Sequence, residues 1–109
     1  MQCNIYLANL DPVVGTEQQG VRPVLIISGD AMNEITDLCI VCPLTTKIKR
    51  YPGSVLIAKN QQNGLTEDSE VLTFQVRVIS KKRLVRKIGT ITEADLVLVK
   101  SGLMDILTF

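Results

Sequence analysis

The chain has no histidine and no tryptophan, and only two tyrosines and two phenylalanines among its 109 residues. Histidine is the side chain whose ordinary pKa lies nearest neutrality, so its absence removes the usual proton donor and acceptor of enzymes. Acid–base chemistry in this chain must therefore use arginine, hydroxyl and carboxylate groups. The same absence removes the commonest metal ligand in proteins.

Long apolar runs are also missing, and none approaches the ~20 residues that a transmembrane helix needs. The opening residues, Met1 to Asn4, lack the basic and then apolar segments of a secretory signal. We therefore expect no membrane partner and a cytoplasmic location. A hydrophobic content of 46% in 109 residues predicts a single domain with one core, over residues 1–109.

Excess charge is small: the net charge of +1 argues against binding nucleic acid by bulk electrostatics. The cations are nevertheless clustered, which is compatible with a short single-stranded target that offers few phosphates. Solvated turns and strand edges explain the second cluster equally well. The first cluster is Lys47, Lys49 and Arg50, and the second is Lys81, Lys82, Arg83, Arg86 and Lys87.

The three cysteines do not form a metal-binding pattern. Cys39 and Cys42 have two-residue spacing, but no second pair and no histidine completes a zinc site. In a strand, residues three apart point to opposite faces, so the two sulfur atoms should diverge. We expect small buried hydrophobic side chains, no metal and no cofactor.

Short β-branched and apolar runs separated by turn residues predict a mainly β chain with one C-terminal helix. Thr92 is the expected N-cap of that helix, and Leu96, Val99, Leu103 and Leu107 form its apolar stripe. Gly102 should weaken the helix by up to ~1 kcal/mol. This order predicts an α+β domain on a strongly bent antiparallel sheet. The predicted strands are 4–9, 22–28, 38–44, 54–57, 70–79 and 84–90, with one helical turn at 29–33.

A glycine-containing polar loop leads into an apolar strand through Arg22 and Pro23. Pro23 fixes its own φ and biases Arg22 toward an extended backbone, so the guanidinium is held on a rigid base. A fixed guanidinium beside a carboxylate and polar groups suits recognition of a phosphate. An ordinary solvated arginine in a hairpin is the competing interpretation of this segment alone.

A series of short motifs in one order resembles the MazF/PemK-type toxin endoribonucleases of bacteria, over roughly residues 5–91. Nine such fragments in the same order are more specific than any one of them. The motifs are Leu10-Asp11-Pro12, Gly15-Thr16-Glu17-Gln18, Gly20-Val21-Arg22-Pro23-Val24-Leu25, Pro43-Leu44-Thr45, Tyr51-Pro52, Gly64-Leu65 with Asp68-Ser69, Gln75-Val76-Arg77, Arg83-Leu84 and Ile88-Gly89.

This resemblance implies an SH3-like barrel of bent antiparallel strands with a C-terminal helix. It implies sequence-specific, metal-independent cleavage of single-stranded RNA, leaving a 2′,3′-cyclic phosphate and a 5′-hydroxyl. Expected partners are RNA, a second copy of the chain and a MazE-like antitoxin. Two other functions remain open: a non-catalytic relative that acts by protein contact, as gyrase poisons of this fold do, and an RNA-binding module without cleavage.

The resemblance assigns the catalytic site to Arg22 and Thr45, with Glu17 as a carboxylate that contributes in some members. Taken alone, Thr45 is more readily a strand-end hydroxyl bound to the backbone. Glu17 orients Arg22 or the 2′-hydroxyl, or stabilises the loop. Candidate RNA-binding residues are Thr16, Gln18, Thr46, Lys47, Lys49, Tyr51, Gln75 and Arg77.

Phe74 departs from the family pattern. In many relatives the residue before the Gln-x-Arg motif is a carboxylate, and in some members this carboxylate is proposed as the general base. Phenylalanine cannot accept a proton. Alternation of Leu72, Phe74 and Val76 in the predicted strand favours packing in the core, with stacking on a base as the alternative. Gln75 and Arg77 share a parity and should face one groove.

Overall fold

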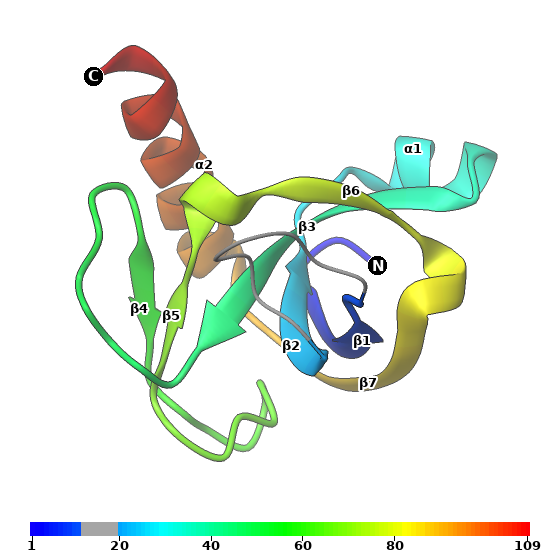
Figure 1. Cartoon of the computed structure of the whole chain (residues 1–109), viewed down its shortest axis with the longest axis horizontal. Helices are drawn as coiled ribbons and strands as arrows, with labels where there is room; N and C mark the ends of the chain where they lie inside the picture. The colour runs from blue at the N-terminus through cyan, green and yellow to red at the C-terminus, as the bar shows by residue number, and fades with distance from the viewer. Residues whose placement is uncertain (12–19) are drawn as a thin grey trace.

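The computed structural model describes residues 1–11 and 20–109, and Figure 1 shows a bent sheet with one long helix, α2, beside it. The predicted strands at 4–9 and 84–90 coincide with β1 and β7, and three others are confirmed with ends shifted by one or two residues. The elements are β1 (Asn4–Asn9), β2 (Val21–Ile26), α1 (Asp30–Ile35), β3 (Leu38–Thr45), β4 (Val55–Ile57), β5 (Ser69–Val71), η1 (Thr73–Gln75), β6 (Arg77–Ser80), η2 (Lys81–Arg83), β7 (Leu84–Thr90) and α2 (Glu93–Thr108).

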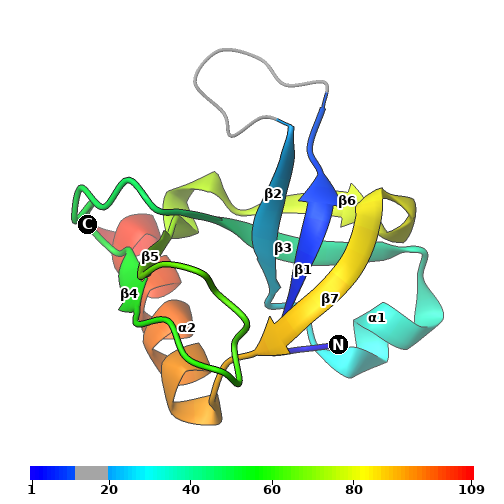
Figure 2. The same cartoon turned by 90° about the horizontal axis from the view of Figure 1, so that it is seen from below.

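Strand β3 organises the sheet, because it pairs along both edges. The strand order is β4-β5-β3-β2-β1-β7, with β6 also on β3, and every pairing is antiparallel. Figure 2 shows β1, β2 and β7 side by side while β3 and β6 cross behind them, which is the predicted strong bend. The α+β class with a C-terminal helix is confirmed. Among the described residues, no helix has the length and apolar character that crossing a membrane requires.

The prediction of one continuous strand at 70–79 is wrong. The chain forms β5, then the 3₁₀ helix η1, then β6, and the two strands pair with different parts of β3. From the pair Leu44–Val71 to the pair Val41–Arg77, β3 moves three residues while the opposite segment moves six. The three-residue turn η1 takes up that difference. A local β pattern cannot reveal such a change of register.

Two hydrophobic clusters lie on opposite faces of β2 and β3. Leu25 and Cys42 belong to the cluster that α2 covers with Leu96 and Val99. The second cluster is built from the other face of the same two strands. Its buried members are Ala8, Leu10, Val24, Ile26, Cys39, Val41 and Ile79.

The predicted burial of the cysteines and the divergence of Cys39 and Cys42 are confirmed by this arrangement. Cys39 and Cys42 lie in different clusters, and all three cysteines are buried with free thiols. Burial raises the pKa of the Cys42 thiol to about 12. Because the thiolate is the reactive form, this sulfur is inert at neutral pH.

Helix α2 begins as predicted, since the Thr92 hydroxyl accepts a hydrogen bond of 3.1 Å from the backbone N–H of Asp95. The predicted apolar stripe is only half right. Leu96 and Val99 are buried, Leu103 is half-buried, and Leu107 is 77% exposed. Figure 1 shows the reason: the C-terminal end of α2 extends away from the sheet.

Gly102 has a packing role that its low helix propensity hides. A Cβ added there would lie 2.0 Å from the backbone oxygen of Gly53, which itself has φ +76°. We expect Gly102→Ala to destabilise the fold by about 1–3 kcal/mol, because this collision outweighs the gain in helix propensity of up to ~1 kcal/mol. Ser101→Ala, at an exposed neighbouring position, is the matched control. Denaturant unfolding measures both, and a Gly102→Ala protein as stable as the wild type would contradict the packing argument.

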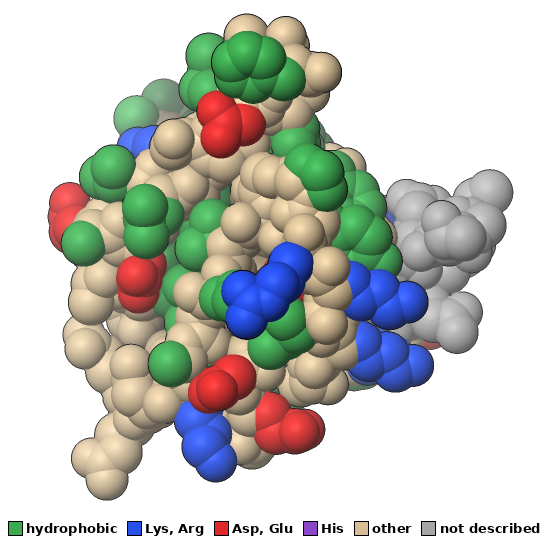
Figure 3. Space-filling view, turned by 90° about the vertical axis from the view of Figure 1, so that its left-hand side faces the viewer, with side chains coloured by type: hydrophobic (Ala, Val, Ile, Leu, Met, Phe, Trp, Pro, Cys, Tyr) green, Lys and Arg blue, Asp and Glu red, His purple; other side chains and the backbone are tan. Residues whose placement is uncertain are grey.

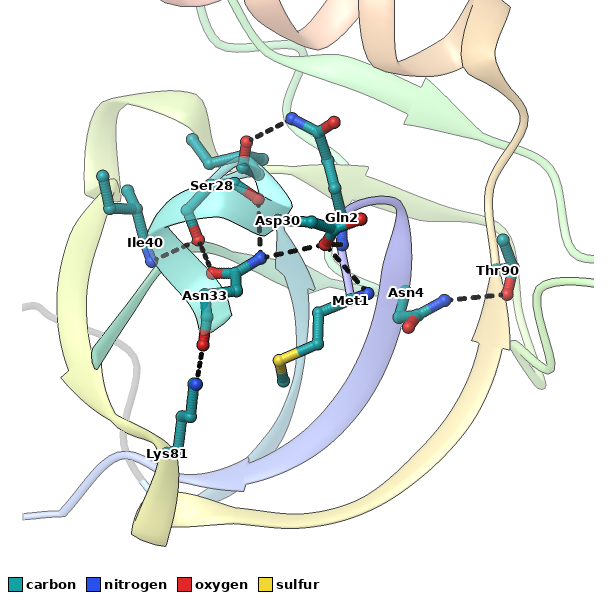
Figure 4. Close-up of polar contacts among 10 residues, drawn as sticks. Met1, Gln2, Asn4, Ser28, Asp30, Asn33, Ile40, Lys81 and Thr90 are labelled. Carbon is teal, nitrogen blue, oxygen red and sulfur yellow. Dashed lines mark hydrogen bonds and ion pairs between the residues drawn. The ribbon is translucent and has the colours of Figure 1, made fainter. Parts of the chain in front are cut away.

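The N-terminus is fixed against α1 by a polar network, drawn in Figure 4. The Met1 amine and the Gln2 backbone N–H both donate to Asp30 Oδ1, at 3.1 and 3.0 Å. These bonds hold the pKa of the Asp30 carboxyl below its ordinary value, and the bond from Gln2 has the largest effect. Buried Asn33 accepts from the Ser28 hydroxyl and donates to the Ser28 backbone oxygen. The network anchors the start of β1.

Candidate active site

Arg22 and Thr45, the two residues predicted at the centre of the site, lie on neighbouring strands. Arg22 is exposed in β2, and Thr45 is half-buried at the end of β3. The last pair between the two strands is Val24 with Pro43, and Arg22 and Thr45 each lie two residues beyond it, which puts them on the same face as that pair by strand alternation. The fold therefore brings a guanidinium and a hydroxyl together on one face.

The Thr45 hydroxyl also has a structural partner. Its oxygen accepts a hydrogen bond of 3.1 Å from the backbone N–H of Lys47. This is the strand-end bond that was the alternative interpretation of Thr45. A hydroxyl that accepts keeps its own proton, so the bond orients Thr45 without using its donor.

An open groove of about 420 Å³ begins at Thr45. Four of the predicted RNA-binding residues line this groove. They supply two cations, a phenol ring and an amide. Figure 3, which views the β4 side of the molecule, shows Lys and Arg side chains with hydrophobic side chains between them. The lining residues are Thr45, Lys47, Lys49, Tyr51, Leu72, Phe74 and Gln75.

Glu70 is a key residue of this region that the sequence analysis missed. Its side chain is fully buried in β5, where it pairs with Thr45. One carboxylate oxygen accepts from the Lys49 backbone N–H at 2.8 Å. The other accepts from the Tyr51 backbone N–H at 2.8 Å and from the Ser54 hydroxyl. Glu70 thus holds the loop at residues 46–53, which carries the cations and the tyrosine of the groove.

Burial of Glu70 raises its pKa, but the hydrogen bonds outweigh that effect. The Ser54 hydroxyl contributes most, and the backbone N–H groups of Lys49, Tyr51 and Arg50 add to it, so the pKa lies below its ordinary value. Glu70 is therefore ionised at neutral pH. The available sequence signal was a carboxylate directly before the apolar Val71 and Leu72.

Phe74 is not in the core, so that prediction is wrong. It lies in η1 with 44% of its surface exposed, and its ring meets that of Tyr51 with centroids 4.9 Å apart and planes at 60°. The expected alternation fails because η1 interrupts the strand. Leu72 is buried, whereas Val76 is exposed like Phe74.

Contrary to the prediction, Gln75 and Arg77 do not lie in one strand. Gln75 closes η1 and lines the groove. Arg77 begins β6 and pairs with Val41, four residues before Thr45 on the same face of β3. That separation is roughly 13 Å along a strand. Gln75 therefore belongs to the groove, and Arg77 lies farther along the same face.

Thr46 takes part in a different pocket of about 210 Å³, together with Pro23, Glu67 and Arg86. It follows Thr45 directly, in the bend after β3 ends. The structure therefore separates Thr46 from the other predicted RNA-binding residues.

The predicted residues Thr16, Glu17 and Gln18 lie outside the described part of the chain. The two ends of their loop are closely tied. The Leu10 backbone N–H donates to the Gly20 oxygen at 2.9 Å, and the Gly20 N–H donates to Asp11 Oδ1 at 2.9 Å. Both ends of the loop therefore meet beside Arg22.

The second basic cluster is partly structural. Arg83 donates to the backbone oxygens of Asn9 and Asp11, and Lys81 donates to the backbone oxygen of Asn33 (Figure 4). Two of the five cations in this cluster thus hold neighbouring segments. Lys82, Arg86 and Lys87 are exposed.

Fold and groove together define a small α+β protein with a site suited to a single strand bearing phosphates. Cations match phosphates, rings match unstacked bases, and an arginine lies on the strand next to a hydroxyl. In the part of the chain that the structure describes, no three His, Cys, Asp or Glu side chains are grouped as metal ligands.

Comparison with known proteins identifies the family. The model of PemK-like, MazF-like toxins of type II toxin–antitoxin systems matches residues 1–107, and the chain belongs to this family. The Endoribonuclease MazF of Staphylococcus epidermidis is 39% identical over 102 residues, which are 92% of this chain and 84% of that protein. The resemblance expected from the motifs is confirmed.

Solved structures agree on the fold. MazF from Deinococcus radiodurans has a TM-score of 0.84 and 28% identity, covering 99% of this chain and 96% of that one. A mycobacterial endoribonuclease in complex with its cognate antitoxin has a TM-score of 0.80 and 23% identity, covering 98% and 93%. At that identity the second likeness speaks for the fold alone.

Proposed function

We propose that this chain is a sequence-specific, metal-independent endoribonuclease that cleaves single-stranded mRNA as the toxin of a toxin–antitoxin pair. The observation that carries the proposal is the groove that contains Thr45, two lysines and two aromatic rings, with Arg22 on the neighbouring strand β2, two residues before its last pair with β3, Val24–Pro43. The S. epidermidis relative named as an endoribonuclease supports the same activity.

In the proposed reaction, the 2′-hydroxyl of the RNA attacks the adjacent phosphorus. The bond to the 5′-oxygen breaks, the 2′-proton is lost and the leaving oxygen gains a proton, giving a 2′,3′-cyclic phosphate and a 5′-hydroxyl. Arg22 stabilises the negative charge that develops on the phosphorane, and Thr45 donates a hydrogen bond to it. Glu17 is the proposed carboxylate of the site. Phe74 has no proton-accepting atom, so the general base lies elsewhere.

The proposal includes a single domain over residues 1–109 that acts in the cytoplasm as a homodimer. A MazE-like antitoxin is the expected inhibitor, since a flexible acidic tail would be attracted to Lys47 and Lys49 in the groove. The mycobacterial structure with its cognate antitoxin is a precedent within this fold.

The direct test is incubation of the purified protein with a long RNA in the presence of EDTA. We expect cleavage to continue at an unchanged rate, because a 2′-hydroxyl attack needs no metal-bound water. Products should accept phosphate from a polynucleotide kinase at the 5′ end without prior dephosphorylation.

Two outcomes would contradict the proposal. Inhibition by EDTA that magnesium reverses would exclude the metal-independent mechanism. Tight RNA binding without cleavage, with or without metal, would favour the RNA-binding module, for which the loss of a proton acceptor at Phe74 is the supporting observation.

A further inference from the structure

Two aromatic rings meet where the groove opens to solvent. Tyr51 is 39% exposed and Phe74 is 44% exposed, and their ring centroids are 4.9 Å apart. Both line the groove that begins at Thr45. Exposed aromatic surface beside a candidate active site is unusual, because such rings normally bury most of their area.

The rings are held in place from both sides. The Tyr51 backbone N–H donates to the buried Glu70 carboxylate at 2.8 Å. Phe74 lies in η1, whose buried Thr73 hydroxyl donates to the backbone oxygen of Gly53 at 2.8 Å. This bond connects the two ring-bearing segments directly. Fixed rings lose little conformational entropy when a ligand binds.

The surroundings of the pair identify the ligand chemistry. Lys47 and Lys49 line the same groove and match the phosphates of a nucleic-acid strand, while the Gln75 amide offers a donor and an acceptor to a base edge. Proteins that bind single strands combine these groups, with rings under the bases and cations along the backbone.

We propose that Tyr51 and Phe74 form a stacking subsite for one unstacked nucleobase of the RNA, and that Phe74 thereby contributes binding affinity at this position. The inference rests on the proposed ribonuclease function. It assigns the binding of a nucleobase to Phe74, which cannot accept a proton in the cleavage reaction.

The test uses an oligouridylate in which every ribose is 2′-O-methylated, so that it cannot be cleaved. A second oligonucleotide has the same backbone but abasic riboses. The wild type should bind the base-containing strand about 5- to 150-fold more tightly, the range expected for stacking one base. Phe74→Leu and Tyr51→Leu should each remove most of this preference while leaving the affinity for the abasic strand unchanged.

The matched control is Phe109→Leu, which alters the only other phenylalanine, fully exposed at the end of the chain. It should keep the full preference. Equal preferences in the wild type and both ring variants would overturn the subsite. A second result would also overturn it. In that result the wild type binds an acidic, tryptophan-containing peptide more tightly than the oligouridylate, and Phe74→Leu loses the peptide affinity. The rings would then belong to a binding site for a protein partner.

Cleavage of a long RNA by the wild type is measured separately. If the wild type cleaves and the ring variants keep the base preference, only the subsite is wrong. If the wild type does not cleave under any condition, the ribonuclease proposal is wrong, and a base preference that depends on the rings would still support the subsite as a binding feature.

Discussion

Replacing Arg22 with alanine is expected to lower the rate of RNA cleavage by about 100- to 1000-fold. In the proposed reaction the guanidinium, on the strand next to Thr45, stabilises the charge that develops on the scissile phosphate. The side chain is exposed, so the free energy of unfolding should change by no more than ~0.5 kcal/mol. Single-turnover cleavage and denaturant unfolding measure the two quantities.

Arg86→Ala is the matched control for this variant. Arg86 is also exposed, but it pairs with Leu7, whereas Arg22 pairs with the next residue, Ala8. Adjacent strand residues point to opposite faces, so Arg86 lies away from the proposed site. Near wild-type cleavage is expected of Arg86→Ala. Near wild-type cleavage by a folded Arg22→Ala protein would place the active site elsewhere.

Replacing Glu70 with glutamine is expected to loosen the 46–53 loop and weaken RNA binding. The carboxylate accepts two backbone N–H groups and the Ser54 hydroxyl. A glutamine amide provides one acceptor and turns an N–H₂ donor toward the remaining donors. The loss should reach about 1–3 kcal/mol for each buried N–H left without an acceptor. We expect KM to rise more than kcat falls, because the loop carries binding groups while Arg22 and Thr45 stay in place.

The pH dependence of stability provides a second measurement. The folded pKa of Glu70 lies below its ordinary value near 4.5, because hydrogen bonds to the ionised form outweigh burial. Its contribution is therefore complete above the ordinary value and is lost as the pH falls through the folded pKa. The stability difference between the wild type and Glu70→Gln should be largest near neutral pH and shrink in acid.

Glu67→Gln, an exposed carboxylate shortly before β5, is the control for this variant. It should change neither KM nor the acid dependence measurably. A stability difference between wild type and Glu70→Gln that stayed constant down to strong acid would show that the ionised carboxylate is not what holds the loop.

Local sequence patterns predicted most of the helices and strands. Thr92 caps α2 because its side chain and the next three residues suffice to make the bond. The Cys39 and Cys42 side chains diverge because strand geometry alternates every residue. Arg22 and Thr45 were found through motifs, but their placement on neighbouring strands depends on the pairing of β2 with β3.

The sequence by itself determined the α+β class, the family and the choice of residues for the proposed chemistry, because alternation, capping and motif spacing act within a few neighbouring residues. Only the tertiary structure decided that η1 interrupts the predicted strand, that Phe74 is exposed against Tyr51 and that Glu70 holds the 46–53 loop. Each of these depends on which part of β3 a distant segment pairs with. That choice follows from contacts between residues about 20 or more apart in the chain. A local sequence pattern contains no information on the entropy cost of closing such loops or on how the distant segments pack.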